Sequence, residues 1–189
     1  NMIFSISKQC VVILICVLGC FSSIRAEEKV IAVVRDGNSE FFNSVITNFR
    51  RELSVLAEGK YTFRIKDEFN AEGKEAEYLK QLNRALFDEE VDLIYTAGIV
   101  VSHHAAKLNP KERIKPIVAG AIEFSNLANK FITESGTSNI NNYTFIMAPL
   151  RIQSDLEAFK QLANAKSIHA LVDEKVVKVL GDDVKKEIA

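Results

Sequence analysis

Four short strand-like runs, separated by amphipathic segments, limit most strongly what this chain can fold into. The runs at residues 29–35, 91–95 and 116–119 are largely apolar, and the run at residues 61–66 alternates between apolar and polar residues. The first is rich in β-branched residues, which is typical of a strand buried on both faces. Helical periodicity marks the segments between the runs, and no hairpin signal joins two of them, so right-handed crossovers are expected. The sequence therefore predicts an α/β fold, a doubly wound parallel sheet with helices on both faces.

Residues 1–26 have the features of a secretory signal. Lys8 precedes an apolar run at residues 10–21, which is too short to span a bilayer comfortably. Two processing sites remain open, namely cleavage after Ala26 and lipid attachment at Cys20. All three cysteines lie in this segment, so cleavage after Ala26 leaves a chain that has no disulfide. We expect an exported, periplasmic protein, with a lipid anchor through Cys20 as the alternative.

The charge balance of the chain argues against a polyanionic partner. The 189 residues carry a net charge of −1, and the basic residues form no cluster typical of nucleic-acid binding. We therefore expect no nucleic acid among the partners.

The segment 91–104, VDLIYTAGIVVSHH, predicts a buried strand that passes through a small-residue turn into a helix. In an open parallel sheet such corners lie at the carboxyl ends of the strands. Backbone N–H groups at a helix start can hold a carboxylate or phosphate there. The corner is therefore a candidate binding site.

Catalytic and metal chemistry find little support in the sequence. His103 and His104 point about 100° apart on a helix and lack a set of further ligands. We expect one of them to pack and the other to be solvated, and we expect His169 to lie in a buried strand. Ser102 has no strained elbow and no orienting acid. We predict no catalytic residue, no metal and no cofactor. For Asp36 and Glu40 two roles remain open: they serve the turn and the first turn of the helix, or they bind a ligand ammonium.

The alternation of predicted strands and helices is interrupted after residue 134. Residues 135–142 are polar and predict a loop, and a short strand at 143–147, a helix at 150–162, a strand at 167–172 and a helix at 174–188 follow. We predict a first α/β lobe at 27–134, a hinge at 135–150 and the beginning of a second, similar lobe at 151–189. The sequence is expected to be a fragment of a two-lobed protein.

Three stretches resemble a known family: VDLIYTAGIVVSHHAAK, IKPIVAGAI, and the long segment SGTSNINNYTFIMAPLRIQSDLEAFKQLANAKSIHALVDE. They are similar to ABC-transporter substrate-binding proteins of the tryptophan/tyrosine type, a periplasmic-binding-protein class I family. Gly136-Thr137-Ser138 is the most specific part. The resemblance implies a small ligand between two lobes and a membrane permease as partner. The alternative is a ligand-sensing or accessory envelope protein that contacts an efflux or signalling complex.

The resemblance also implies which residues contact the ligand, because the family's first-lobe ligand loops correspond to three corners of this chain. Ala121-Ile122-Glu123 departs from the small polar residue and Asp-Pro pair of members that take aromatic amino acids, so we expect a divergent member. Its solute is then a small organic molecule, either amino-acid-like or anionic. The predicted ligand-binding residues are Asn38, Ser39, Glu40, Thr96, Ala97, Gly98, Gly120, Ala121 and Ile122.

Overall fold

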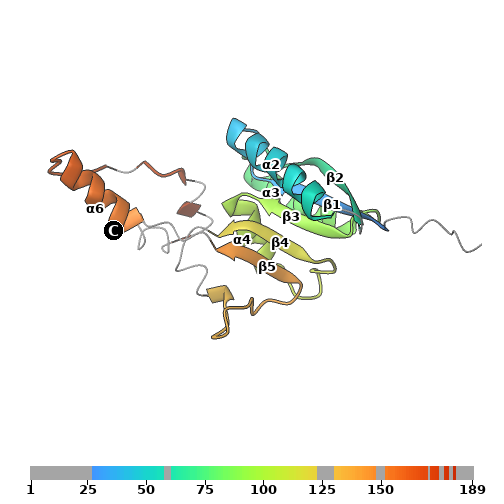
Figure 1. The fold of residues 1–189 in the computed structure, drawn as a ribbon. Coiled ribbons are helices and arrows are strands. Elements are labelled where there is room, and N and C mark those ends of the chain that lie inside the picture. The colour runs from blue at the N-terminus through green and yellow to red at the C-terminus, as the bar shows by residue number, and fades with distance from the viewer. Residues whose placement is uncertain are drawn as a thin grey trace, which may run out of the picture.

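A computed structural model describes residues 27–57, 61–122, 130–147, 152–169, 171–174, 177–178 and 181. The elements follow one another along the chain in the alternating order that the apolar runs predict (Figure 1). They are β1 (Glu27–Arg35), α2 (Glu40–Leu56), β2 (Tyr61–Asn70), α3 (Glu75–Phe87), β3 (Leu93–Ala97), α4 (Ile99–Lys107), β4 (Ile117–Ile122), β5 (Tyr143–Met147) and α6 (Ile152–Leu162).

The five strands form one parallel sheet in the order β2-β1-β3-β4-β5. The chain therefore moves from β1 to one side to make β2, and then returns across β1 to make β3, β4 and β5. A sheet wound in both directions from its first strand is the doubly wound arrangement. The predicted fold class is confirmed.

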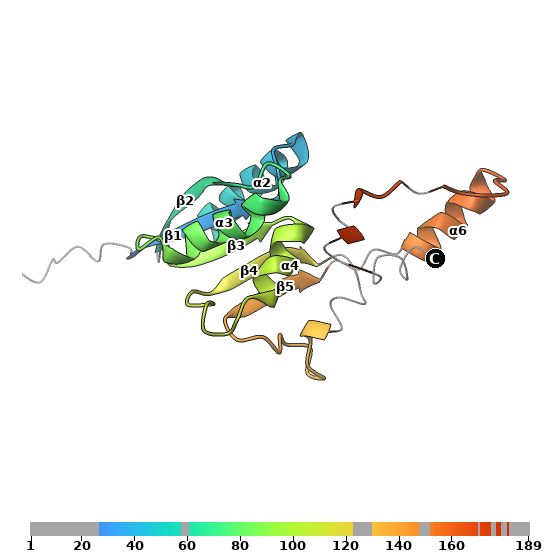
Figure 2. The ribbon, with the colours of Figure 1, turned by 180° about the vertical axis from the view of Figure 1, so that it is seen from behind.

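Helices cover both faces of this sheet. α2 lies in front of it in Figure 1, whereas α3 and α4 lie in front in Figure 2, which shows the molecule from behind. The side chains of β1 alternate between the two layers: Val34 packs in the cluster that includes residues of α3 and α4, and Val33 packs in the cluster that includes Ile46 of α2. This alternation follows from the two-residue period of a strand, and it explains why β1 is apolar on both faces.

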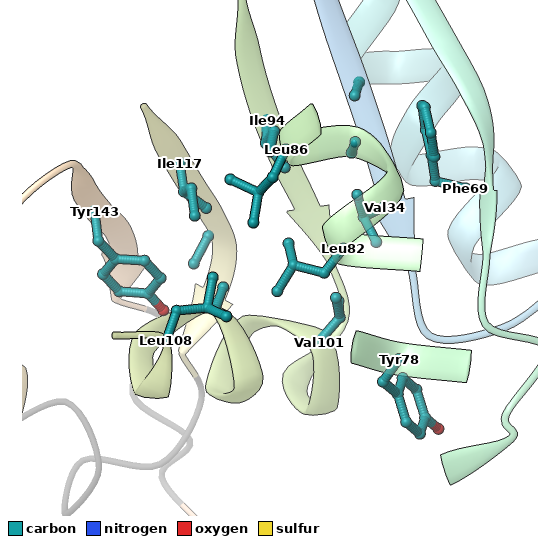
Figure 3. Packing of buried hydrophobic residues seen from close by; sticks show 14 of the residues in the cluster. Val34, Phe69, Tyr78, Leu82, Leu86, Ile94, Val101, Leu108, Ile117 and Tyr143 are labelled. Carbon is teal, nitrogen blue, oxygen red and sulfur yellow. The ribbon is translucent and has the colours of Figure 1, made fainter. Parts of the chain in front are cut away.

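The larger core lies between the sheet and helices α3 and α4. Figure 3 shows Leu82 and Leu86 of α3 and Val101 of α4 near the strand residues Ile94 and Ile117. All five side chains have relative exposures of 1% or less. Their burial fixes both helices against the sheet, and the helices in turn fix the turns at the carboxyl ends of the strands.

β5 extends the same sheet beyond the boundary predicted at residue 134. Its residues 143–147 lie in the segment expected to be a hinge, yet they pair with β4 in parallel, from Ile117 with Tyr143 to Ile122 with Met147. Tyr143 is 4% exposed, and its hydroxyl donates to the Ser102 carbonyl oxygen at 3.0 Å. β5 is therefore a strand of the same sheet as β1 to β4.

The segment predicted as a buried strand at 167–172 is different. Residues 167–169 and 171–172 have no strand conformation, and Leu171 is fully exposed. A strand needs a neighbour for its backbone hydrogen bonds, and among the described residues none pairs with this segment. His169, expected in the core or at a sheet edge, is exposed for the same reason.

The structure leaves several predictions untested. The signal segment 1–26 lies outside the described residues, as does most of the helix expected at 174–188. In the part of the chain that is described, no helix is long and apolar enough to cross a membrane.

Candidate functional site

The carboxyl ends of β1, β3 and β4 lie next to one another, because these three strands are neighbours in a parallel sheet. The three predicted corners therefore lie along one edge. Between β1 and β3 the winding changes direction, with α2 on one face and α4 on the other. Such a switch point leaves a crevice outside the strand ends, where α/β proteins bind ligands. Arg35 at the end of β1 pairs with Ala97 of β3 across the switch point. On its other side it pairs with Asn70 of β2.

A carboxylate of the protein itself occupies the start of α4. Asp36, the residue after β1, accepts hydrogen bonds from the backbone N–H of Val100 at 2.9 Å and of Val101 at 2.7 Å. The positive end of the helix dipole favours a negative group at this place. In this conformation Asp36, and not a ligand, accepts the N–H groups of Val100 and Val101.

Gly98 makes room for this carboxylate. Its φ of 148° is a conformation that residues with a side chain rarely adopt, and an added Cβ would lie 2.3 Å from the Asp36 Cγ. The sequence predicts that Gly98 contacts a ligand. The structure gives it a second role, the close approach of Asp36 to the first turn of α4.

Burial raises the pKa of Asp36 from 3.8 to about 6, while its hydrogen bonds with Val101 and Val100 act in the opposite direction. Desolvation disfavours the charged form, and N–H donors favour it. The burial effect is the larger one here. Tyr78 of α3 is near enough for the Asp36 charge to raise its pKa, in addition to the larger effect of burial.

Thr96 is fully buried on the α4 side of the sheet. Its hydroxyl lies 2.8 Å from the Ser102 hydroxyl, which donates to the Gly98 carbonyl oxygen at 2.5 Å. The Thr96 side chain therefore holds the turn between β3 and α4, and in this conformation a ligand does not reach it. Ser102 is engaged in the same contacts.

The corner after β1 is more open. Asn38, Ser39 and Glu40 are exposed, and Ser39 caps α2 by accepting a hydrogen bond from the Phe42 N–H at 3.3 Å. The cap satisfies one of the N–H groups that a helix leaves unpaired at its start. The side chains of Asn38 and Glu40 thus remain accessible at the edge.

Arg35 is a functional candidate that sequence reasoning did not identify. It ends β1 on the α2 face, where its Nη1 donates to the Asn43 Oδ1 at 3.1 Å. Its Nε is buried, and among the described residues it has no hydrogen-bond partner. The available signal was a charged residue at the end of a strand whose preceding five residues are all apolar.

Gly120, predicted at the third corner, lies under a tyrosine. An added Cβ would lie 2.3 Å from the Tyr95 Oη, so glycine is required for this hydroxyl to rest there. The Tyr95 ring is stacked on Phe49 of α2 at a centroid distance of 4.4 Å. Ala121 and Ile122 follow Gly120 within β4, at the same edge.

Both histidines of α4 pack against aromatic rings, which corrects the expectation that one of them is solvated. His103 is 4% exposed and lies 6.5 Å from the Phe131 ring, and His104 is stacked on Tyr78 at 5.8 Å. Burial lowers the pKa of His104, which favours its neutral form. The described residues contain no group of three or more His, Cys, Asp or Glu side chains that could hold a metal ion.

A cavity of about 650 Å³ lies elsewhere, at the amino-terminal ends of β3, β4 and β5. Leu93, Ile117 and Tyr143, which begin these strands, line it together with the loop 138–142. It is shallow and open, and it lies at the sheet edge opposite to the switch point. We favour the switch point as the site because charged and polar groups converge there.

Comparison with known proteins supports the fold. No family model and no curated protein matches the chain. A solved structure, the ABC domain from Streptococcus pneumonia in complex with L-Trp, is similar with a TM-score of 0.62 at 15% sequence identity. The similarity covers 86% of this chain and 51% of that one, so the chain spans about half the length of its structural neighbour. At this identity the likeness shows the fold alone, an α/β fold with a parallel sheet.

Proposed function

We propose that this chain is an exported solute-binding protein of an ABC-type importer, which binds a small organic solute in a cleft between two lobes. The observation that carries the proposal is the alignment of three corners along the switch-point edge, in a fold shared with an ABC domain solved with L-Trp. Solute binding at this edge needs no catalytic group. The proposal places the protein in the periplasm, with a membrane permease as its partner.

In this mechanism the described sheet supplies one wall of the cleft. The exposed side chains of Asn38 and Glu40 contact the solute from the corner after β1, and Ala97 and Gly98 keep the corner after β3 small. Closure of the second lobe removes water from the solute and strengthens its polar contacts. The closed form then docks onto the permease.

The test is a search for the solute in the protein as the cell produces it. Native mass spectrometry of the purified protein should show a bound small molecule that denaturation releases. The protein is unfolded to remove the compound and then refolded. The compound, added back at a concentration 100 times Kd, should raise the free energy of unfolding by about 2.7 kcal/mol. A protein that carries no compound, and whose Tm no amino acid or small organic acid raises, would contradict the proposal.

One observation favours a second candidate function, an accessory envelope protein that uses the same fold to contact another protein. The N–H groups at the start of α4 are satisfied internally by Asp36, so this corner offers a ligand fewer free donors than expected. The two candidates differ in the mass-spectrometric test, because only the solute-binding protein releases a small molecule. Cross-linking in intact cells would identify a permease in one case and a different envelope protein in the other.

A further inference from the structure

Arg35 lies at the centre of the switch-point edge, on the face that α2 covers. In β1, Ile31 and Val33 pack in the cluster on the α2 side, and the two-residue period places Arg35 on the same side. The hydrogen bond from its Nη1 to the Asn43 Oδ1 on α2 agrees with this orientation. Its register partner on β3 is Ala97, which has only a methyl group as its side chain.

The guanidinium of Arg35 has more donors than the protein uses. An arginine carries five N–H donors and keeps its charge at every physiological pH. Among the described residues, only Asn43 accepts a hydrogen bond from it, and no carboxylate lies within the 4.0 Å of an ion pair. The Nε is buried without a partner. Buried polar groups are rarely left unpaired, and this N–H can donate to an oxygen atom of a ligand.

A second polar group approaches the same place from the other side. The Tyr95 hydroxyl rests on Gly120, the residue that follows the pair formed by Thr96 of β3 and Ala119 of β4. Arg35 and this hydroxyl therefore lie on opposite sides of Ala97, both on the α2 face. A charged donor and a hydroxyl thus flank the carboxyl end of β3 on the α2 face.

Three backbone donors at the helix starts of this edge are already engaged. Asp36 accepts the N–H groups of Val100 and Val101, and Ser39 accepts that of Phe42. These three N–H groups are therefore not free for a ligand in this conformation, whereas the guanidinium of Arg35 has unused donors. An anionic group of the solute would therefore bind at Arg35 rather than at the helix starts.

We propose that Arg35 binds the carboxylate of the solute through its free guanidinium N–H groups, with the Tyr95 hydroxyl as a second donor. The inference rests on the proposed function, because it assigns the chemical class of the same solute. A planar guanidinium matches a carboxylate with two parallel hydrogen bonds. The single positive charge of Arg35 matches the one negative charge of a carboxylate and leaves the second charge of a phosphate dianion uncompensated.

The first test compares acids with their amides. Each L-amino acid and short carboxylic acid is assayed beside its primary amide by ligand-induced Tm shift on the complete protein. We expect the acids to bind and the amides to be inactive. Arg35→Gln should weaken binding of the acid about 10- to 100-fold, since it removes a charged hydrogen-bonded pair. Equal binding of acid and amide, or unchanged affinity in Arg35→Gln, would overturn the proposal.

A matched control is available on α2. Arg51 is exposed and pairs only with its neighbour Glu52 at 3.0 Å among the described residues, so Arg51→Gln should leave both Tm and affinity unchanged. Tyr95→Phe keeps the stacking on Phe49 and should weaken the acid about 3- to 10-fold by loss of one neutral hydrogen bond. A Tm of ligand-free Arg35→Gln close to that of the wild type shows that the loss is not unfolding.

The second test does not depend on finding the natural solute. The Nε–Hε signal of Arg35 is followed by NMR during titration with acetate and, separately, with inorganic phosphate. We expect a saturable shift of the Arg35 signal with acetate and none for Arg51. A missing acetate response, or a response to phosphate alone, overturns the carboxylate assignment whatever the solute screen shows. A clear acetate response without any solute in the screen contradicts the proposed transport function and leaves Arg35 as an oxyanion site.

Discussion

Replacement of Asp36 by asparagine tests the electrostatics of the switch point. The Asp36→Asn variant would keep the shape of the side chain and one acceptor for the α4 N–H groups, but its amide carries no charge at any pH. In the native protein burial raises the pKa of Asp36 from 3.8 to about 6. At about 1.4 kcal/mol for each tenfold change, this rise corresponds to about 3 kcal/mol between the protonated and ionised forms.

The sign of the effect follows from linkage. The native state binds the Asp36 proton more tightly than the unfolded state does, so this carboxyl stabilises the fold most below pH 3.8. The contribution is lost as the pH rises through about 6. The free energy of unfolding of the wild type minus that of Asp36→Asn should therefore fall by up to about 3 kcal/mol between pH 3.8 and pH 7.

Urea unfolding of both proteins at intervals from pH 4.5 to pH 7.5 measures this difference, and ¹³C NMR of the Asp36 carboxyl measures its pKa directly. Both proteins lose the contributions of all other carboxylates equally, so the comparison isolates residue 36. A difference that stays constant across the range, together with titration of Asp36 near pH 4, would refute the argument that burial outweighs the two N–H donors.

Three further substitutions test the packing that positions the edge. Gly98→Ala places a Cβ 2.3 Å from the Asp36 Cγ and should destabilise the fold by about 2–4 kcal/mol in urea unfolding. An unchanged stability would contradict the capping geometry. Thr96→Val removes the contact with Ser102 and should cost about 1 kcal/mol, with a faster amide exchange in α4. Leu82→Ala empties a fully buried position and should cost about 2–5 kcal/mol, whereas Leu79→Ala, on the exposed side of α3, should cost much less.

The fold class was predictable because buried strands and helices have characteristic patterns of apolar residues in the sequence. β1 is apolar on both faces, and an apolar stripe marks the inner side of α3. Each pattern can be recognised in the sequence without knowing which elements pack against it. β5 was harder to assign. Its neighbour β4 lies more than twenty residues away, and a short strand next to a polar loop gives no sign of which sheet it joins.

The sequence predicts where the three corners lie, but not the hydrogen bonds that their residues make. Topology alone brings the three corners to one edge. The partner of Asp36 is 64 residues away on α4, and no local pattern predicts such a contact. Likewise, whether Arg35 faces solvent or a helix depends on the placement of α2. Strand ends are therefore easier to locate from a sequence than the hydrogen bonds that decide what they bind.

Chemical-shift mapping tests the central claim most directly, that the switch-point edge binds the solute. The complete ¹⁵N-labelled protein is titrated with the compound released from it, and the perturbed amides are located on the sheet. We predict that they cluster at residues 35–40, 95–98 and 120–122, at the carboxyl ends of β1, β3 and β4. Perturbations confined to the cavity at residues 138–144, at the opposite edge, would contradict the account.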